Sequence, residues 1–300
     1  MSRPGRPAAY DAYVRTGSSA VKLNLSGTAY AGQPSGDTIP FQTVRRGDAD
    51  IRLYSISAGS RWSAGTVVNS RNWEFAPSLS GRWLLFGRRN RGTSPETDRL
   101  LLYNTGSRQL RVIAEHRGEP DRDVFPGQVN GDYLVYTTCT PARATCRVTR
   151  YRISTRRRLT VPQPPRRIGY GAGVSAAGVV YFVRGAWACG AAAAIRSYDP
   201  ATATGRLLLR LGQGYDADQG VRVRQRPRRR VPLFALPVLL EVGSLGRLQG
   251  EGHVTVYSGP LPPSGGVSRP PFAVIAPHCT QFDGCSFSST VGPPSSRPIS

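Results

Sequence analysis

The sequence predicts an all-β chain and, within that class, an incomplete β-propeller of about four recognisable blades. Three observations lead to this prediction. The 34 Gly and 25 Pro among 300 residues favour short strands joined by many turns. Hydrophobic residues do not follow a helical period in any segment of the sequence. Two series of aromatic residues recur with a period of about 47 residues, which is typical of a multi-stranded repeat.

The first aromatic series closes a short apolar strand that follows a turn of small residues. The run Gly81-Arg-Trp-Leu-Leu-Phe86 is the clearest copy. Successive members are 45, 50 and 45 positions apart, so each occupies the same place in a repeated unit. We expect them to pack in the cores between blades. The series consists of Phe41, Phe86, Tyr136 and Tyr181.

The second aromatic series places a tyrosine between an apolar strand and a polar turn. Its members are 49, 48 and 47 positions apart. The hairpins between the two series vary in length and are polar, because loops accept insertions while paired strands keep their register. Several strands in a unit of 40 to 50 residues are typical of a propeller blade. These tyrosines are Tyr54, Tyr103, Tyr151 and Tyr198.

The repeat divides the chain into three parts. Residues 1–30 are expected to be an irregular N-terminal segment, and residues 31–220 hold the propeller repeats. Residues 221–300 form a tail rich in Arg, Pro, Ser and Gly, which we expect to be disordered. The four units cover approximately residues 34–68, 74–115, 124–162 and 171–211.

One segment carries a resemblance to a known family. It is the run Val68-Asn-Ser-Arg-Asn-Trp-Glu-Phe-Ala-Pro-Ser-Leu-Ser-Gly-Arg-Trp-Leu-Leu-Phe-Gly-Arg88. Together with the recurring Leu-x-x-Tyr and polar turn, it resembles the TolB-type, WD40-like repeat of six- to eight-bladed propellers, and more narrowly TolB-like proteins of actinobacteria. The resemblance covers about residues 30–220. It implies a propeller fold, which serves interaction modules, receptors and enzymes alike.

The repeat stops near residue 220. The first aromatic residue of a fifth unit is due near residues 226–231, where the chain reads Arg222-Val-Arg-Gln-Arg-Pro-Arg-Arg-Arg230. A GC-rich gene read in another frame yields Arg, Pro, Gly and Ser in excess. The hypothesis is therefore that this chain is a truncated or frame-altered member of the family. Four blades would leave the ring open and expose flanks that a closed propeller covers.

The charge of the chain supports a separate interpretation. The net charge is +22, and 39 of the 40 basic residues are Arg. GC-rich coding accounts for the excess of Arg over Lys. A field of this sign nevertheless attracts nucleic acid and other polyanions at low salt. An Arg-rich polyanion binder, for which nucleic acid is the main candidate partner, is therefore the first alternative function.

Residues with catalytic chemistry are scarce. His116, His253 and His278 each lack a second histidine or a carboxylate at ligand spacing. Motifs of serine hydrolases, zinc proteases and phosphate-binding loops are not found. The sequence therefore predicts no catalytic residue, no metal ligand and no cofactor, and it favours a role other than that of an enzyme. A propeller-type hydrolase or lyase is the second alternative.

Two cysteines provide the most local prediction. Cys139 and Cys146 flank the hairpin of the third unit, where facing strand positions lie within bridging distance. We expect a disulfide between them in an oxidising compartment. The hairpin cysteines and the family resemblance favour the cell envelope or another extracytoplasmic location. Against this, neither a signal peptide nor a membrane span can be recognised, so the location stays open.

The function that the sequence favours is that of a non-catalytic TolB-like interaction module. Such a module would bind protein or cell-envelope components through loops at one face of the propeller. This prediction depends on the family resemblance and on the scarcity of catalytic residues. The sequence identifies neither the partner nor the physiological role.

Overall fold

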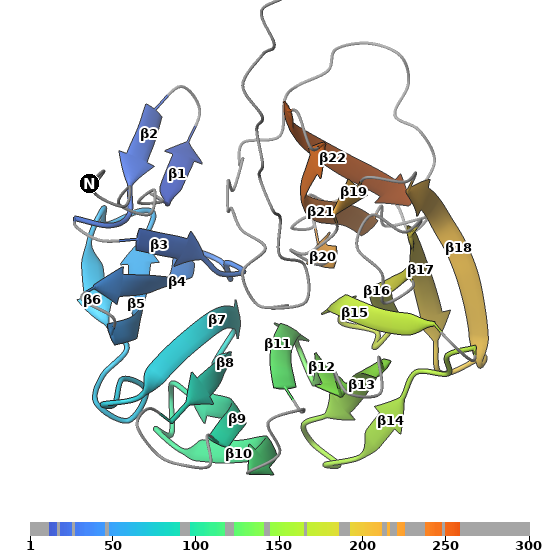
Figure 1. Ribbon diagram of the computed structural model, residues 1–300. Coiled ribbons are helices and arrows are strands. Elements are labelled where there is room, and N and C mark those ends of the chain that lie inside the picture. The colour runs from blue at the N-terminus through green and yellow to red at the C-terminus, as the bar shows by residue number, and fades with distance from the viewer. Residues whose placement is uncertain are drawn as a thin grey trace, which may run out of the picture.

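A computed structural model gives the arrangement of the chain (Figure 1). It describes residues 12–16, 19–25, 28–45, 48–90, 97–117, 123–140, 145–164, 167–185, 193–211, 215–216, 221–225, 238–247 and 250–258. All the regular secondary structure assigned in these ranges is β-strand. A helix long and apolar enough to span a membrane does not occur in them.

Four consecutive units of four antiparallel strands make up most of the described chain. The first blade contains β3 (Thr28–Ala31), β4 (Thr38–Arg45), β5 (Asp48–Ser55) and β6 (Arg61–Ser63). The second contains β7 (Trp73–Ser80), β8 (Trp83–Arg89), β9 (Thr97–Asn104) and β10 (Leu110–Arg117). The third contains β11 (Asp123–Asn130), β12 (Tyr133–Thr140), β13 (Thr145–Arg152) and β14 (Arg158–Thr160). The fourth contains β15 (Ile168–Val174), β16 (Val180–Gly185), β17 (Ala193–Asp199) and β18 (Thr204–Leu211).

The blades are arranged around a common centre. Figure 1 shows the first strands β7, β11 and β15 nearest that centre and the fourth strands β10, β14 and β18 at the rim. Within each blade, strands adjacent in sequence pair in antiparallel fashion. The first and second blades are also joined by parallel bridges, between Ala49 and Trp73 and between Gln33 and Ser78. The predicted all-β propeller is therefore confirmed.

The first hairpin of every blade turns at a glycine. Gly36, Gly81, Gly131 and Gly178 have φ values of 56°, 53°, 58° and 83°. This left-handed region is readily accessible to glycine, whereas a side chain there is strained. The turns of small residues that begin the first aromatic series in the sequence thus have a backbone reason.

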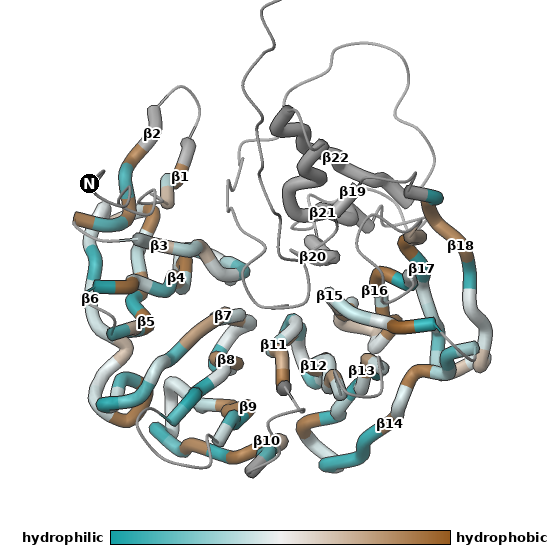
Figure 2. The backbone as a smooth tube through the Cα atoms, viewed as in Figure 1, coloured by the Kyte–Doolittle hydropathy of each residue, from teal (hydrophilic) through white to brown (hydrophobic). Residues whose placement is uncertain are grey.

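The apolar cores lie between the blades. Figure 2 shows hydrophobic residues recurring in every blade from β3 to β18. One core cluster joins Leu85 and Leu102 of the second blade to Leu134 and Tyr151 of the third. Another joins Val148 of the third blade to residues of the fourth. Each blade is therefore stabilised by burying apolar surface against its neighbours.

The tyrosines of the second series occupy matching positions in the third strand of each blade. Three of them are buried and Tyr198 is half-buried. Tyr54, Tyr103, Tyr151 and Tyr198 are paired across the sheet with Ile39, Leu84, Leu134 and Val180, in that order. The repeat recognised in the sequence therefore corresponds to a repeat of strand register.

The same register revises one member of the first series. Counting from the partners of the tyrosines, the equivalents of Phe41, Phe86 and Tyr136 lie two positions further along the second strand. In the fourth blade this position is Phe182 rather than Tyr181. Tyr181 is also buried, but its side chain points to the opposite face of the sheet because side chains alternate along a strand.

A third aromatic series was not recognised in the sequence. One aromatic residue of each first strand pairs with the position directly after the core aromatic of the second strand. In the second blade it pairs with Gly87, where a Cβ atom would collide with the Phe75 ring. A glycine is therefore needed at that point. The series consists of Tyr30, Phe75, Phe125 and Tyr170.

The N-terminal hairpin has the register of the outer half of a blade. It is formed by β1 (Tyr13–Thr16) and β2 (Ser19–Lys22), and Tyr13 pairs with Lys22. The backbone N–H of Leu23 donates to the carbonyl of Ala12, as that of Val161 does to Val148 after the third blade's last strand. Residues 12–22, expected to be irregular, thus pair as third and fourth strands do.

The segment after residue 220 differs from the disordered tail that was expected. A further antiparallel sheet contains β19 (Tyr215–Asp216), β20 (Val221–Gln225), β21 (Val238–Arg247) and β22 (Gly250–Ser258). Both β19 and β20 pair with β21 along the same edge. Strand pairing depends on backbone hydrogen bonds, so it does not require the aromatic pattern that identified the first four units. Residues 259–300 lie outside the described part of the chain.

Polar side chains of the innermost strands join neighbouring blades. The Ser78 hydroxyl donates to Gln33 Oε1 at 2.9 Å and accepts from the backbone N–H of Val129 at 3.0 Å. The backbone N–H of Val174 donates to Gln128 Oε1 at 2.9 Å. These hydrogen bonds connect the first four blades in sequence close to the centre of the ring.

Candidate functional site

One position in each blade determines how the space next to the preceding blade is filled. It lies two residues after the core aromatic of the second strand, and therefore on the same face of the sheet. Arginine occupies this position in the second and fourth blades, and threonine in the first and third. The four residues are Thr43, Arg88, Thr138 and Arg184.

Arg88 fills the interface between the first and second blades. Its Nε donates to Glu74 Oε1 at 2.8 Å, and its Nη2 donates to the carbonyls of Val67 at 3.1 Å and Val68 at 2.7 Å. The guanidinium also lies 5.7 Å from the centroid of the Phe86 ring. These contacts tie β8 to the segment that follows the first blade.

Glu74, the partner of Arg88, is fully buried. Burial raises the pKa of its carboxyl, while hydrogen bonds from Ser70 and the Arg88 guanidinium oppose that change. Because an unpaired charge is costly at a buried position, the ion pair with Arg88 is required wherever Glu74 is ionised. Glu74 therefore serves to hold Arg88.

Arg184 has the same role between the third and fourth blades, with a different acceptor. Its Nε donates to Gln163 Oε1 at 2.9 Å and its Nη2 to the carbonyl of Pro162 at 3.1 Å. The residue in the register position of Glu74 is Gly169. A Cβ atom on Gly169 would lie about 2.5 Å from Gln163 Nε2, so the Gln163 side chain uses the room that a side chain at residue 169 would need.

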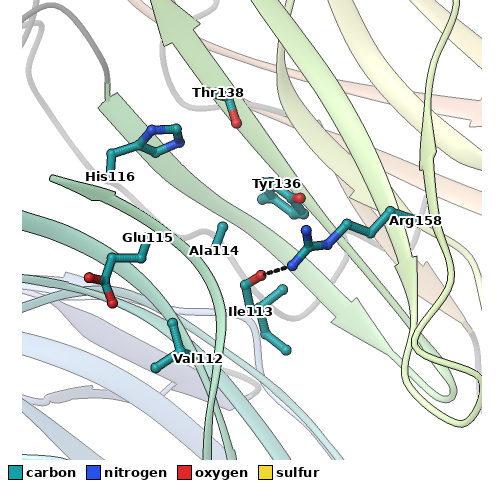
Figure 3. Close-up of a pocket in the computed structure, with 8 residues that line it drawn as sticks. All are labelled: Val112, Ile113, Ala114, Glu115, His116, Tyr136, Thr138 and Arg158. Atoms are coloured by element: carbon teal, nitrogen blue, oxygen red, sulfur yellow. Dashed lines mark hydrogen bonds between the residues drawn. The ribbon is translucent and has the colours of Figure 1, made fainter. Parts of the chain in front are cut away.

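The interface between the second and third blades has a pocket instead of an arginine from the second strand. Thr138 is the equivalent of Arg88, and its short side chain borders a cavity of about 400 Å³ (Figure 3). The cavity opens between the rim strand β10 and the strands β12 and β14. We call it the interblade pocket, and it is lined by Val112, Ile113, Ala114, Glu115, His116, Tyr136, Thr138 and Arg158.

Arg158 is the cationic side chain of the interblade pocket that enters from the third blade. Its Nη2 donates to the carbonyl of Ile113 and so links β14 to β10. Figure 3 shows its guanidinium between Ile113 and Tyr136. Within the described part of the chain, Arg158 forms no ion pair with a carboxylate. Its remaining N–H groups are therefore available for a ligand.

The other polar groups of the pocket differ in their hydrogen bonds and in their burial. Glu115 accepts a hydrogen bond from Arg99 Nε at 3.0 Å, and Figure 3 shows its carboxylate directed away from Arg158. Tyr136 is buried, and burial raises the pKa of its hydroxyl although the nearby Arg158 opposes the change. Thr138 and His116 lie on the same side of β10 as Arg158 (Figure 3). The pocket is therefore polar and rich in hydrogen-bond donors.

The interblade hydrogen bonds of Arg158 and those of Arg88 and Arg184 come from alternate blades. Arg158 pairs with Tyr151, and in the first blade Arg61 pairs with Tyr54 in the same way. Arg61 Nη2 donates to the carbonyl of Lys22, so it also links a rim strand to the preceding hairpin. The first and third blades, which have threonine at the positions equivalent to Arg88 and Arg184, thus have an arginine on their fourth strand instead. The interblade pocket lies next to one of these fourth-strand arginines, Arg158.

The predicted cysteine pair lies at the far end of the third blade's hairpin. Cys139 and Cys146 face each other directly in the register of β12 and β13, with a Cα–Cα distance of 4.0 Å. Their sulfur atoms are joined in a disulfide, and both residues are buried against Ile168 of the fourth blade. The pair is separate from the interblade pocket, which faces the second blade.

A metal site is not found among the residues that the structure describes. They contain no group of three or more His, Cys, Asp or Glu side chains placed to share an ion. Of the three histidines, His116 lines the interblade pocket, His253 lies in β22, and His278 falls outside the described residues. Sequence reasoning missed the pocket because its residues come from two blades and share no motif. The only signal in the sequence was the threonine at residue 138 where the neighbouring units have arginine.

Comparisons with known proteins concern the fold. Neither the protein-family models nor the curated proteins match this sequence. Solved structures that are similar include TolB from Acinetobacter baumannii, which is 16% identical with a TM-score of 0.49 over 85% of this chain and 65% of that one. A putative TolB from Agrobacterium tumefaciens is 13% identical, with a TM-score of 0.49 over 68% of this chain and 74% of that one. A puromycin-hydrolyzing peptidase from Mycobacterium tuberculosis is 12% identical, with a TM-score of 0.43 over 75% of this chain and 35% of that one.

These similarities do not extend to activity. Prolyl endopeptidases and an oligogalacturonate lyase are also among the similar structures. The chain spans 65% of the Acinetobacter TolB and 35% of the mycobacterial peptidase. What those whole proteins act on is therefore not assigned to this chain. In its fold, which rests on the sheets and registers described above, the chain is a β-propeller.

Proposed function

We propose that this propeller is a non-catalytic interaction module that binds a protein or a cell-envelope component. The observation that carries the proposal is the use of three polar side chains on or next to the innermost strands. Gln33, Ser78 and Gln128 each form a hydrogen bond to a neighbouring blade. Groups that act in catalysis must instead be oriented toward a substrate. The polar centre of this ring serves its assembly.

Two aspartates at turns between strands support the same proposal. Asp37 accepts hydrogen bonds from Ser55 and Ser57, and Asp132 accepts them from Arg152 and Ser154 in the equivalent turn of the third blade. These hydrogen bonds lower the pKa of both carboxyls, although for Asp132 desolvation acts in the opposite direction. A general acid needs a raised pKa, so these two aspartates are suited to holding turns.

The remaining paired carboxylates belong to interfaces and strands. Arg89 donates from Nε and Nη2 to the two carboxylate oxygens of Asp98, at 2.7 and 2.8 Å. Glu74 is held by Arg88, and Glu115 by Arg99. Each of these carboxylates lies next to an arginine that neutralises it, so none forms a carboxylate dyad.

The interblade pocket is the place where we expect the partner to bind. It is a polar cavity at the rim, bordered by two blades, and an exposed guanidinium lies at its edge. Binding sites are commonly concave and contain a few polar groups that fix the orientation of the ligand. A partner that inserts one side chain there would contact both blades.

The proposal is tested by capture of a partner with a matched pocket variant. The full chain and its Thr138→Arg variant are immobilised and exposed to a detergent-solubilised envelope fraction. Thr138→Arg introduces the residue found in the second and fourth blades and fills the pocket. Because buried Val124 offers this arginine no acceptor, a melting curve verifies that the variant keeps its fold. We expect a component that the wild-type chain retains and the variant loses. Retention by both chains, or turnover of the captured component, would contradict the proposal.

A second candidate, polyanion binding, is favoured by one arginine cluster. Burial, together with the charges of Arg196 and Arg167, lowers the pKa of Arg184. A bound anion would offset the repulsion between these like charges. If the chain binds nucleic acid in this way, the logarithm of its affinity for a duplex of random sequence should fall linearly with the logarithm of salt concentration. An affinity that is insensitive to salt would exclude this candidate.

A further inference from the structure

We propose that the interblade pocket binds a carboxylate carried by an acidic segment of a partner protein. The inference rests on the proposed function and deepens it, because it names the chemical group that the module would hold. Three observations carry it: the charge at the pocket, the donors around it, and the residue that replaces Glu74 in the third blade.

The charge at the pocket comes mainly from Arg158. The guanidinium has five N–H donors, and the structure commits one of its nitrogen atoms to the Ile113 carbonyl. Among the described residues, no carboxylate neutralises it. Glu115, which lines the pocket, is paired with Arg99 and points away from Arg158 (Figure 3). The guanidinium therefore offers charge-assisted hydrogen bonds to an incoming carboxylate.

Hydroxyl groups add further donors next to Arg158. Thr138 and Tyr136 project from β12 toward the same cavity (Figure 3). Burial favours the protonated form of the Tyr136 hydroxyl, since it raises the pKa. A hydroxyl that keeps its proton can donate to an oxygen anion. The pocket thus combines one fixed positive charge with hydroxyl donors.

The comparison of blades excludes the opposite ligand, a guanidinium from the partner. In the two filled interfaces the chain provides an acceptor for its own arginine, namely Glu74 for Arg88 and Gln163 for Arg184. In the third blade, the register position of Glu74 is occupied by Val124, a buried apolar residue opposite Thr138. A second guanidinium would find Arg158 and no acceptor at that position. The site therefore fits an anion.

The experiment measures binding of short peptides to the full chain by isothermal titration calorimetry. The probes are N-acetylated, C-amidated tetra-glutamate, the matching tetra-glutamine, and free glutarate. The variants are Arg158→Gln, which removes the charge, and Thr138→Met, which fills the cavity without adding a charge. Arg157→Gln is the matched control, because Arg157 is an exposed neighbour outside the pocket and its loss changes the net charge equally. Melting curves of all chains verify the fold.

We expect tetra-glutamate to bind the wild-type chain and tetra-glutamine not to bind. Arg158→Gln should weaken the tetra-glutamate affinity by about tenfold or more, as loss of a charged hydrogen bond does, while Arg157→Gln leaves it unchanged. Thr138→Met should weaken the affinity because its side chain occupies the space of the ligand. Glutarate that binds as tightly as the peptide would support the carboxylate and assign it to a small molecule instead of a protein segment. Equal losses in Arg157→Gln and Arg158→Gln would overturn the inference, because the binding would then follow net charge alone.

The outcomes also separate this inference from the proposed function. A partner that is captured by the wild-type chain and lost by Thr138→Arg, combined with no binding of tetra-glutamate, would retain the module and remove the carboxylate. Capture that is unaffected by Thr138→Arg would place the partner elsewhere on the propeller. In that case peptide binding at the pocket could still be detected by calorimetry.

Discussion

The interface between the first and second blades and the interface between the second and third blades are built on the same register, but they are filled differently. In the first, Arg88 occupies the space and is held by Glu74. In the second, Thr138 and Val124 stand at the two equivalent positions and a cavity of about 400 Å³ results. The comparison shows that two substitutions in a repeated unit are enough to turn a structural contact into a candidate binding site.

The largest effect is expected where the filled interface loses its buried acid. Glu74→Ala leaves the Arg88 guanidinium without its carboxylate at a position that is 12% exposed. We expect the free energy of unfolding to fall by about 3 kcal/mol or more, measured by urea denaturation. Arg152→Ala breaks the ion pair with Asp132, which is 49% and 36% exposed, and serves as the control with a loss below about 1 kcal/mol. Equal losses in the two variants would refute the structural role of Glu74.

The second effect concerns the blade that contains the pocket. Cys139→Ser combined with Cys146→Ser removes the cross-strand link between β12 and β13. We expect a loss of about 2 kcal/mol, since the closed loop is short. Reducing the wild-type chain with dithiothreitol should give the same urea midpoint as the double variant. A midpoint that does not respond to dithiothreitol would show that the link is not formed in solution.

The third effect distinguishes the two filled interfaces from each other. Arg184→Met removes the hydrogen bonds to Gln163 and Pro162, but Gln163 is neutral, so no buried charge is left behind. We expect a loss of about 1 kcal/mol in urea denaturation, clearly smaller than for Glu74→Ala. A loss as large as that of Glu74→Ala would mean that charge pairing does not explain the difference between the interfaces.

The smallest effect is a difference in pH dependence between two carboxylates. Burial raises the pKa of Glu74 above its ordinary value of 4.5, so its contribution to stability falls as the pH rises from that value through the folded pKa. Asp132 behaves oppositely. Although desolvation would raise its pKa, hydrogen bonds from Ser154 and Arg152 hold it below 3.8, so its contribution is complete above 3.8 and is lost as the pH falls.

Two variants separate these contributions in urea midpoints recorded across the acid range. Glu74→Gln should flatten the decline on the higher-pH side of 4.5. Asp132→Asn should flatten the decline on the acid side of 3.8. Glu74→Gln should therefore make the slope of the urea midpoint against pH more positive, and Asp132→Asn should make it more negative. If both variants changed this slope in the same direction, the assigned directions of the two pKa shifts would be contradicted.

The fold could be predicted from the sequence to the extent that it depends on local pattern. Tyr54, Tyr103 and their equivalents mark the third strand of each blade because a core aromatic recurs at a fixed distance from a turn. The register itself was less visible. Tyr181 and Phe182 are adjacent aromatics, and only the pairing of Val180 with Tyr198 decides which one is equivalent to Phe86.

The candidate site could not be predicted, for a physical reason. Its residues are brought together by the packing of two blades, and packing between sheets leaves no periodic signal in either one. Arg158 and Ile113 are 45 positions apart in sequence and meet through a single hydrogen bond. The alternation of Thr138 with Arg88 and Arg184 was present in the sequence, but its meaning depends on knowing that these positions are equivalent.

Hydrogen–deuterium exchange of the propeller, with and without the envelope component that it captures, tests the central claim most directly. The account predicts that added protection is concentrated in residues 110–116 and 133–140, which border the interblade pocket, while residues 65–74 at the filled interface are unchanged. Protection confined to the innermost strands β7, β11 and β15 would contradict it, because the partner would then bind at the centre of the ring.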